Sequence, residues 1–367
     1  MKRRDFLTGA AVSGVTAAAA VGGLAAPAIA QDKQEWKMVT TWPKNAPGVG
    51  VNAQRFADAV TEMSGGRLTV RLFSAGELVP PFECLDAVQS DVAQMAHATP
   101  YYWVGKNPAL NYFSTIPFGL MAWELSGWIY FGGGQELWDE IYAPFGVKGL
   151  YAGNSGSQAG GWFNKEINSV EDLKGLKMRI AGLGGEVMRR LGVAVTLTPP
   201  GEIMPALMSG AVDAAEWVSP WLDIAFGLQK AAKFYYMPAF HEPGPALEVM
   251  INKARWDSLA PDLQAIVRRA AQASAQESLA DFTYHNIDVF SQIKEKWPDV
   301  QIRTFNDEIL QALATTTRQV VEDVAARDPL AKKVHDSYMA YNAKAFAYQK
   351  NADLAVLQMR KWFFEGA

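Results

Sequence analysis

Two series of alternating strand and helix patterns constrain the fold of this chain more than any other feature. In the first, "EWKMVTTWP" (35–43) has strand character and "RLTVRLF" (67–73) alternates apolar and polar residues. Between them, residues 51–66 carry Phe56, Val60 and Met63 at helical spacing and end in two glycines. Strand, helix and strand at this spacing predict a βαβ unit in a parallel sheet.

The second series begins at "VKGLYAG" (147–153) and runs to residue 217. It contains expected strands at 177–180, 193–199 and 211–217, with helices at 185–192 and 201–210. At 367 residues the chain exceeds the usual size of one compact domain. We therefore predict an α/β fold of two lobes joined by hinge segments, with a ligand cleft at the carboxyl ends of strands.

The expected division has four parts. Residues 1–30 are a leader, 31–152 form a first lobe to which later strands return, and 153–252 form a second lobe. Residues 253–367 are helical, with a hinge-spanning segment and a long terminal helix rich in aromatic side chains. That helix needs a surface to cover it, on its own lobes or on a second subunit.

The leader predicts export. Arg3 and Arg4 precede an uncharged Ala/Gly/Val stretch that ends in Ala28-Ile29-Ala30, as in a twin-arginine signal with cleavage after Ala30. A transmembrane anchor is the alternative, but the stretch is weakly hydrophobic. The mature protein is expected to be periplasmic without stable membrane insertion. A formal net charge of -4 gives no excess of basic residues that would bind nucleic acid.

The sequence carries no recognisable catalytic motif. Its four histidines stand outside zinc-protease contexts, and there is no G-x-S-x-G or P-loop pattern. Cys84 is the single cysteine, which excludes a disulfide framework. These features favour a binding protein over an enzyme.

A carboxylate inside an apolar run marks the candidate site. Glu216 stands in "DAAEWVSPW" (213–221) beside Trp217, and a buried acid is costly unless a cation or donor meets it. Arg179, near the end of an apolar strand, has the planar fork that suits a carboxylate. Glu216 and Gln158 together offer oxygen ligands for Na⁺ or Ca²⁺. The alternative for Glu216 is a salt bridge at the lobe boundary.

Further candidates surround these residues. Glu242 could complete an ion site and His241 could donate to a ligand, while Tyr101 and Tyr102 could form a wall with hydroxyl donors. Asn154 lies in the same small-residue loop as Gln158, and we include it among the substrate-binding candidates. The segment "GLGGE" (182–186) is either a helix entry that presents amides to an anion or a plain turn.

The segments "SVEDLKGLKMRIAG", "VTLTPPGEIMPALMSGAVDAAEW" and "YYWVGKNPALNYFSTIPFG" resemble the substrate-binding subunits of tripartite ATP-independent periplasmic (TRAP) transporters over nearly the whole mature chain. The resemblance implies the two-lobe architecture of type II-like periplasmic binding proteins, which close on a small organic acid and deliver it to a membrane permease. It also implies that Arg179 forms an ion pair with the ligand carboxylate.

Within that family the chain resembles the branch that binds 2-oxo or 2-hydroxy monocarboxylates through a metal ion, Na⁺ or Ca²⁺. The resemblance implies that Gln158, Glu216 and the carbonyl of Trp217 hold the ion, with Glu242 a less certain ligand. It further implies a homodimer that exchanges the terminal helix. A metal-free binder of a dicarboxylate or sugar acid and a secreted metal-dependent hydrolase or lyase are the alternatives.

Overall fold

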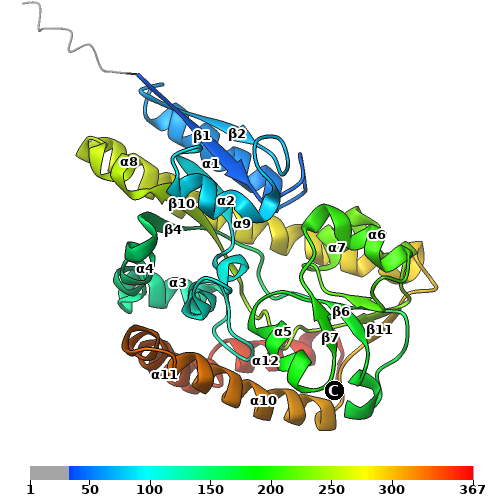
Figure 1. Cartoon of the computed structure of the whole chain (residues 1–367). Coiled ribbons are helices and arrows are strands. Elements are labelled where there is room, and N and C mark those ends of the chain that lie inside the picture. Colours follow the sequence, from blue (N-terminus) through cyan, green and yellow to red (C-terminus); the bar gives the residue numbers. More distant parts are fainter. Residues whose placement is uncertain (1–32, 367) are drawn as a thin grey trace, which may run out of the picture. The chain divides into compact units, whose positions relative to one another are not determined.

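Two mixed sheets organise residues 33–366, the part of the chain that the computed structural model describes (Figure 1). The predicted leader, 1–30, lies outside these residues. The first sheet has the strand order β2-β1-β3-β10-β4 and the second the order β11-β9-β5-β8-β6-β7. The strands of the first sheet are β1 (Gln34–Thr40), β2 (Leu68–Phe73), β3 (Met95–Ala98), β4 (Val147–Asn154) and β10 (Ala246–Asn252). Those of the second are β5 (Gly161–Phe163), β6 (Lys177–Arg179), β7 (Ala194–Thr196), β8 (Ala214–Ala215), β9 (Phe234–Tyr236) and β11 (Gln301–Arg303).

Helices cover both sheets and form the C-terminal part. The α-helices are α1 (Val49–Met63), α2 (Cys84–Gln89), α3 (Ala122–Phe131), α4 (Gly134–Tyr142), α5 (Gly182–Arg190), α6 (Ile203–Met208), α7 (Pro220–Phe226), α8 (Lys253–Ser258), α9 (Pro261–Lys296), α10 (Asp307–Ala325), α11 (Pro329–Gln349) and α12 (Asp353–Phe364). The 3₁₀ turns are η1 (Pro81–Glu83), η2 (Pro100–Trp103), η3 (Pro108–Phe113), η4 (Ala143–Phe145), η5 (Val170–Leu173), η6 (Pro200–Glu202) and η7 (Leu228–Lys230). Among these described helices, none is both long and apolar enough to cross a bilayer.

The predicted βαβ unit is confirmed. β1 and β2 pair in parallel and α1 connects them, with Phe56 and Val60 fully buried. Met63 is 48% exposed, because the helix ends there and its last turn leaves the sheet. Gly65 and Gly66 follow with positive φ angles of 61° and 73°, which a residue with a Cβ adopts at a cost.

Strand β10 returns from the later part of the chain to the first sheet. β10 lies in the first sheet, antiparallel to both β3 and β4, although it falls within the range 153–252 assigned to the second lobe. All seven of its residues are buried, which suits a central strand covered on both faces. The later strand β11 joins the second sheet, in parallel with β9.

The chain consequently passes between the sheets at three places within the described residues. Residues 155–160 connect β4 to β5, residues 237–245 connect β9 to β10, and α8 with α9 connects β10 to β11. The 36-residue α9 spans about 54 Å at the usual helical rise. It packs on α1 and β4 of the first lobe and on α7 of the second (Figure 1).

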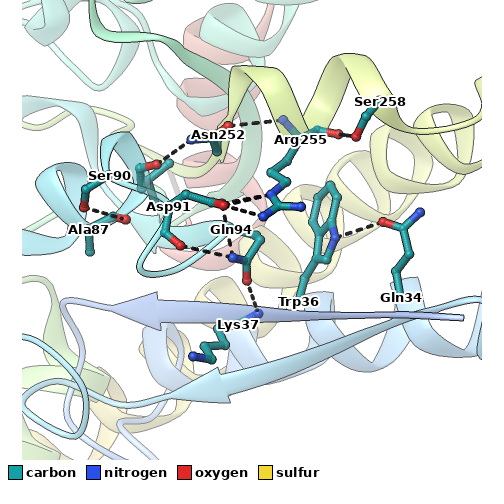
Figure 2. A network of polar contacts seen from close by, with 11 residues as sticks. Gln34, Trp36, Lys37, Ala87, Ser90, Asp91, Gln94, Asn252, Arg255 and Ser258 are labelled. Carbon is teal, nitrogen blue, oxygen red and sulfur yellow. Dashed lines mark hydrogen bonds and ion pairs between the residues drawn. The ribbon is translucent and has the colours of Figure 1, made fainter.

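A polar network attaches α8, where the third connection begins, to the first sheet. Figure 2 shows Arg255 of α8 donating to the Asp91 carboxylate, with Nε 2.9 Å from Oδ2. Gln94 donates to the Asp91 carbonyl and accepts from the backbone N–H of Lys37 in β1 at 3.0 Å. Asn252 at the end of β10 donates to the Val88 carbonyl. These bonds join β1, α2, the approach to β3 and the β10–α8 junction.

The predicted long terminal helix is two helices. α11 ends at Gln349 and α12 begins at Asp353, because Ala352 leaves the helical region with φ -114° and ψ -101°. No residue of α12 is buried in this chain. Its large apolar side chains are between 47% and 83% exposed, namely Leu354, Val356, Leu357, Met359, Trp362, Phe363 and Phe364.

Candidate binding site

The predicted site residues come together where the chain passes between the two sheets. Arg179 is the last residue of β6, and Glu216 and Trp217 follow directly after β8. Gln158 lies on the first connection, and His241 and Glu242 lie on the second. Backbone bonds hold these segments together: Glu216 N–H donates to the Arg179 carbonyl at 3.0 Å, and Gln158 N–H donates to the Glu242 carbonyl at 3.1 Å.

Two glycines allow the segments to approach this closely. Gly161 has φ 119°, and a Cβ there would lie 3.0 Å from the Ala215 carbonyl oxygen. Gly184 of α5 faces His241, and a Cβ there would lie only 2.6 Å from the His241 Cβ. Side chains at either position would therefore push apart the residues that surround Glu216.

Glu216 meets Arg179 directly. Arg179 Nη1 lies 3.0 Å from Glu216 Oε2 and 2.5 Å from the Glu216 carbonyl oxygen, and both side chains are 1% exposed. Arg179 Nε donates to the Thr198 carbonyl at 3.3 Å. The salt bridge at the lobe boundary is thus present. It also occupies half of the guanidinium fork that we expected to bind a ligand carboxylate, leaving Nη2 as the nitrogen without a partner.

The salt bridge leaves many buried polar atoms around it unsatisfied. Within residues 33–366, the buried atoms without a hydrogen-bond partner include Gln158 Oε1, Arg179 Nη2, Glu216 Oε1, Tyr102 OH, both nitrogens of His241 and both carboxylate oxygens of Glu242. All of these side chains belong to residues that are at most 6% exposed. Buried polar groups are normally bonded, so such a concentration of unpaired atoms indicates a place that a ligand fills.

The charges of the site point to a cation among these atoms. Ligand atoms of Glu216, His241 and Glu242 all lie within 4.8 Å of one another. Burial and the neighbouring Glu216 carboxylate raise the pKa of Glu242 well above its usual value, against the opposing effect of Arg179. Two buried carboxylates and an amide oxygen form a hard donor set, which fits Na⁺ or Ca²⁺ better than a softer ion.

Aromatic side chains enclose the charged groups from the first lobe. Tyr101 and Tyr102 lie on η2, which follows β3, and burial together with Glu242 raises the pKa of Tyr101 well above its ordinary value. Their rings contact each other, and Tyr102 also contacts Trp42. Arg179 lies 5.6 Å from the centre of the Trp217 ring, a cation–π contact from within the second lobe.

Trp42 is a site residue that the sequence analysis missed. Its ring contacts Trp217 of the other lobe, with centroids 6.3 Å apart. Its indole N–H donates to Nδ1 of the fully buried His97 at 2.8 Å, and burial lowers the pKa of His97 to about 3, so the imidazole stays a neutral acceptor. The sequence signal was weak, since "TTWPK" reads as a strand end.

Asn154 and the glycine segment, which opens helix α5, make hydrogen bonds within the protein. The Asn154 amide donates to the Gly244 carbonyl and accepts from Gly156 N–H, so it fixes the Gln158 loop against the second connection. In "GLGGE", the N–H of Leu183 donates to the Asn111 side chain rather than pointing at free space.

Two buried carboxylates outside the unpaired cluster were also missed. Asp223 accepts from Val218 N–H, Trp162 Nε1 and the Tyr235 hydroxyl, which supports the segment after Trp217. Glu248 in β10 accepts from the Tyr142 hydroxyl and from Trp103 Nε1 of η2. Asp223 reads in the sequence as an ordinary acidic residue of a helix's first turn. Glu248 gives the signal of a charge in an apolar strand.

Two α/β lobes that enclose a charged, unsatisfied cluster at their connections define a solute-binding protein of the two-lobe class. The chain belongs to the bacterial extracellular solute-binding protein family 7, whose sequence model matches residues 38–328. This is a family of solute receptors of TRAP transporters rather than of enzymes, and it places the protein in the periplasm.

Relatives extend over nearly the whole chain. A monocarboxylate 2-oxoacid-binding periplasmic protein of Nostoc sp. is 40% identical over 358 residues, covering 97% of this chain and 98% of the relative. A TRAP periplasmic solute-binding protein of Pseudoalteromonas atlantica, solved with bound sodium and pyruvate, is 39% identical with a TM-score of 0.87. That of Colwellia psychrerythraea, solved with bound calcium and pyruvate, is 40% identical with a TM-score of 0.86. Each structure covers 89% of this chain and 99% of its own.

Proposed function

We propose that this protein captures a small 2-oxo or 2-hydroxy monocarboxylate, of the pyruvate or lactate kind, together with a Na⁺ or Ca²⁺ ion, and delivers the acid to a TRAP permease. One observation carries the proposal: the unpaired buried atoms at the lobe connections include both a cationic donor and several anionic or amide oxygens. The ligands named for the Nostoc relative and for the two solved structures support the same class of solute.

The residues that would hold the ion are Gln158, Glu216 and the carbonyl of Trp217, with Glu242 adjacent. Gln158 is already oriented for this role, because its amide nitrogen donates to Ser155 Oγ at 2.8 Å and its oxygen is left without a partner. When bound, the ion supplies the positive charge that two buried carboxylates need and attracts the oxygens of the acid.

The acid itself would meet groups from both lobes. Arg179 Nη2 would donate to the ligand carboxylate, while the Tyr101 and Tyr102 hydroxyls and His241 would donate to the remaining oxygens. Arg179 and Lys148 are the only buried arginine or lysine residues of the described chain, and Lys148, near the start of β4, pairs with Asp139. A second carboxylate on the ligand would therefore lack a cationic partner, which favours monocarboxylates over dicarboxylates.

Charge balance bears on the choice of ion. When Glu216, Glu242 and the acid are all ionised, Arg179 neutralises one of the three negative charges. The two that remain favour Ca²⁺. A protonated Glu242 leaves one net negative charge and favours Na⁺. Because Glu242 stands beside the proposed ion ligands rather than among them, we propose Na⁺ as the first choice, with Ca²⁺ as the alternative if Glu242 also binds the ion.

Export and assembly complete the proposal. The Arg3-Arg4 leader would direct the folded protein through the twin-arginine route, with cleavage after Ala30. The exposed apolar side chains of α12 would be covered in a homodimer by a second copy of the chain.

A titration calorimetry screen tests the function. Pyruvate, lactate, succinate and sialic acid are titrated into protein freed of cations by chelation, then again with Na⁺ or Ca²⁺ added. We expect ion-dependent binding of pyruvate or lactate. Binding of succinate or sialic acid that is indifferent to both ions would support the metal-free alternative and contradict the proposal.

A further inference from the structure

Helix α5 lacks a cap from its own segment. Its N-cap residue is Ala181, which has the extended backbone of an N-cap but no side chain that can accept a hydrogen bond. The first backbone N–H groups of a helix have no partner within the helix itself. In most helices Ser, Thr, Asp or Asn fills this role from the N-cap position.

The missing cap comes from the other lobe. Asn111 lies on η3, in the segment that follows β3 and η2, and its Oδ1 accepts from the N–H of Leu183 at 3.1 Å. Asn111 is fully buried, and its amide nitrogen donates to the Pro108 carbonyl at 2.8 Å, which sets the orientation of the acceptor oxygen. A helix of the second lobe is thus capped by a side chain of the first.

The contact is made possible by Gly182. This first residue of α5 has φ 61°, and a Cβ there would lie 3.1 Å from Asn111 Oδ1 and 3.3 Å from the Tyr101 ring. The glycine therefore lets the helix start come against both Asn111 and a tyrosine of the candidate site. The backbone of α5 begins three residues after Arg179, so the capped start of the helix and the arginine are neighbours along the chain in the second lobe.

We propose that Asn111 is a closure latch, a positioning residue that caps α5 only when the lobes are closed and so holds Arg179 and the tyrosines against the ligand. The proposal rests on the proposed function insofar as the ligand is a monocarboxylate. When the lobes separate, Leu183 loses its acceptor and α5 has no cap of its own. The latch therefore favours the closed state and slows release of the ligand.

Binding kinetics of Asn111→Ala test the latch, with pyruvate and Na⁺ as the probe. Loss of a helix cap corresponds to about a fivefold change in an equilibrium constant, so we expect a Kd about fivefold higher. The increase should come from faster dissociation, with association unchanged. The matched control is Asn252→Ala, because Asn252 is also buried, accepts from Arg255 N–H at the start of α8 and donates to the Val88 carbonyl, all within the first lobe. It should leave both rates as in the wild type.

A double-mutant cycle separates the cap from general loss of packing. Ala181→Ser gives α5 an N-cap of its own, so the effect of Asn111→Ala on Kd should shrink in that background. An equal effect in both backgrounds would overturn the latch. Should Asn111→Ala fail to fold, Asn111→Ser replaces it, since the serine hydroxyl ends one bond short of the Oδ1 position.

A distance measurement makes the latch testable apart from the ligand. The single cysteine, Cys84, is buried, so spin labels can be placed at Glu62→Cys on α1 and Met208→Cys on α6. In ligand-free protein, Asn111→Ala should lower the ratio of the closed to the open population about fivefold, and Asn252→Ala should not. If the wild type does not bind pyruvate but Asn111→Ala still lowers the closed-to-open ratio, only the proposed function is contradicted. The latch is overturned if Asn111→Ala leaves the closed-to-open ratio unchanged, or if no closed population is found, and in addition Asn111→Ala leaves the pyruvate affinity unchanged or no pyruvate binds.

Discussion

The buried pair of Arg179 and Glu216 has two roles with opposite requirements: the two charges compensate each other, and each residue leaves a polar atom free for a ligand. Each charge compensates the other at 1% exposure, and each also keeps one polar atom without a partner. The candidate site is therefore built around a buried salt bridge. Changes at either residue should affect stability and binding together.

Arg179→Ala should abolish pyruvate binding and also lower the free energy of unfolding by about 3 kcal/mol, because it leaves Glu216 as an uncompensated buried charge. Denaturant unfolding and calorimetry measure the two effects. The double change Arg179→Ala with Glu216→Gln should recover much of the stability without recovering binding. A single variant as stable as the wild type would contradict this account.

Glu216→Gln should act through the ion. The amide keeps an oxygen but removes the charge, so the affinity for Na⁺ or Ca²⁺ should fall more than tenfold, and pyruvate affinity with it. Calorimetry at rising cation concentration should show partial rescue of pyruvate binding. If excess cation gives no rescue, Glu216 does not act through an ion.

At the scale of the element, β10 and η2 meet at a buried acid. Glu248 accepts from Tyr142 and from Trp103, and burial raises its pKa to about 8, against the opposing effect of these donors. The folded state therefore keeps a proton that the unfolded chain releases above its ordinary pKa of 4.5. The favourable contribution is complete below that ordinary value and is lost as the pH rises to about 8.

Glu248→Gln removes this titration, so its stability relative to the wild type should increase between about pH 4.5 and pH 8, by at most about 1.4 kcal/mol per pH unit. Denaturant unfolding across this range measures the difference. Glu62→Gln, at an exposed position of α1, serves as the matched control and should show a flat profile. A flat profile for Glu248→Gln as well would place Glu248 in an ionised state throughout.

The sequence was sufficient for elements whose signal is local. The βαβ unit and α5 follow from periodicity and breakers, and Glu216 and Arg179 stand out as charges in apolar runs. We expected later strands to return to the first lobe but did not identify β10 as one of them, because an apolar strand fits either sheet. Trp42 and Asn111 were missed for a related reason: their partners, Trp217 and Leu183, are remote in sequence.

At the scale of the whole molecule, α12 is the element that the chain does not cover. Its exposed apolar side chains and the proposed homodimer make a direct prediction. Ending the chain after Lys350 should convert a dimer to a monomer in sedimentation velocity, with the pyruvate Kd changed less than twofold. A monomeric full-length protein would contradict the role given to α12, and Arg327→Ala, a surface change on another segment, should leave the dimer intact.

The division of the site between lobes has a kinetic consequence. The proposed ion ligands Gln158, Glu216 and Trp217 come from the second lobe and the first connection, whereas the tyrosines and Trp42 come from the first lobe. Ion ligands gathered on one side are available before the lobes meet, so binding should be ordered, with the cation first and the acid second. In stopped-flow measurements, the association rate of pyruvate should rise with Na⁺ or Ca²⁺ and reach a plateau. The cation alone should bind measurably, which would make the periplasmic ion concentration a control on how quickly the receptor loads.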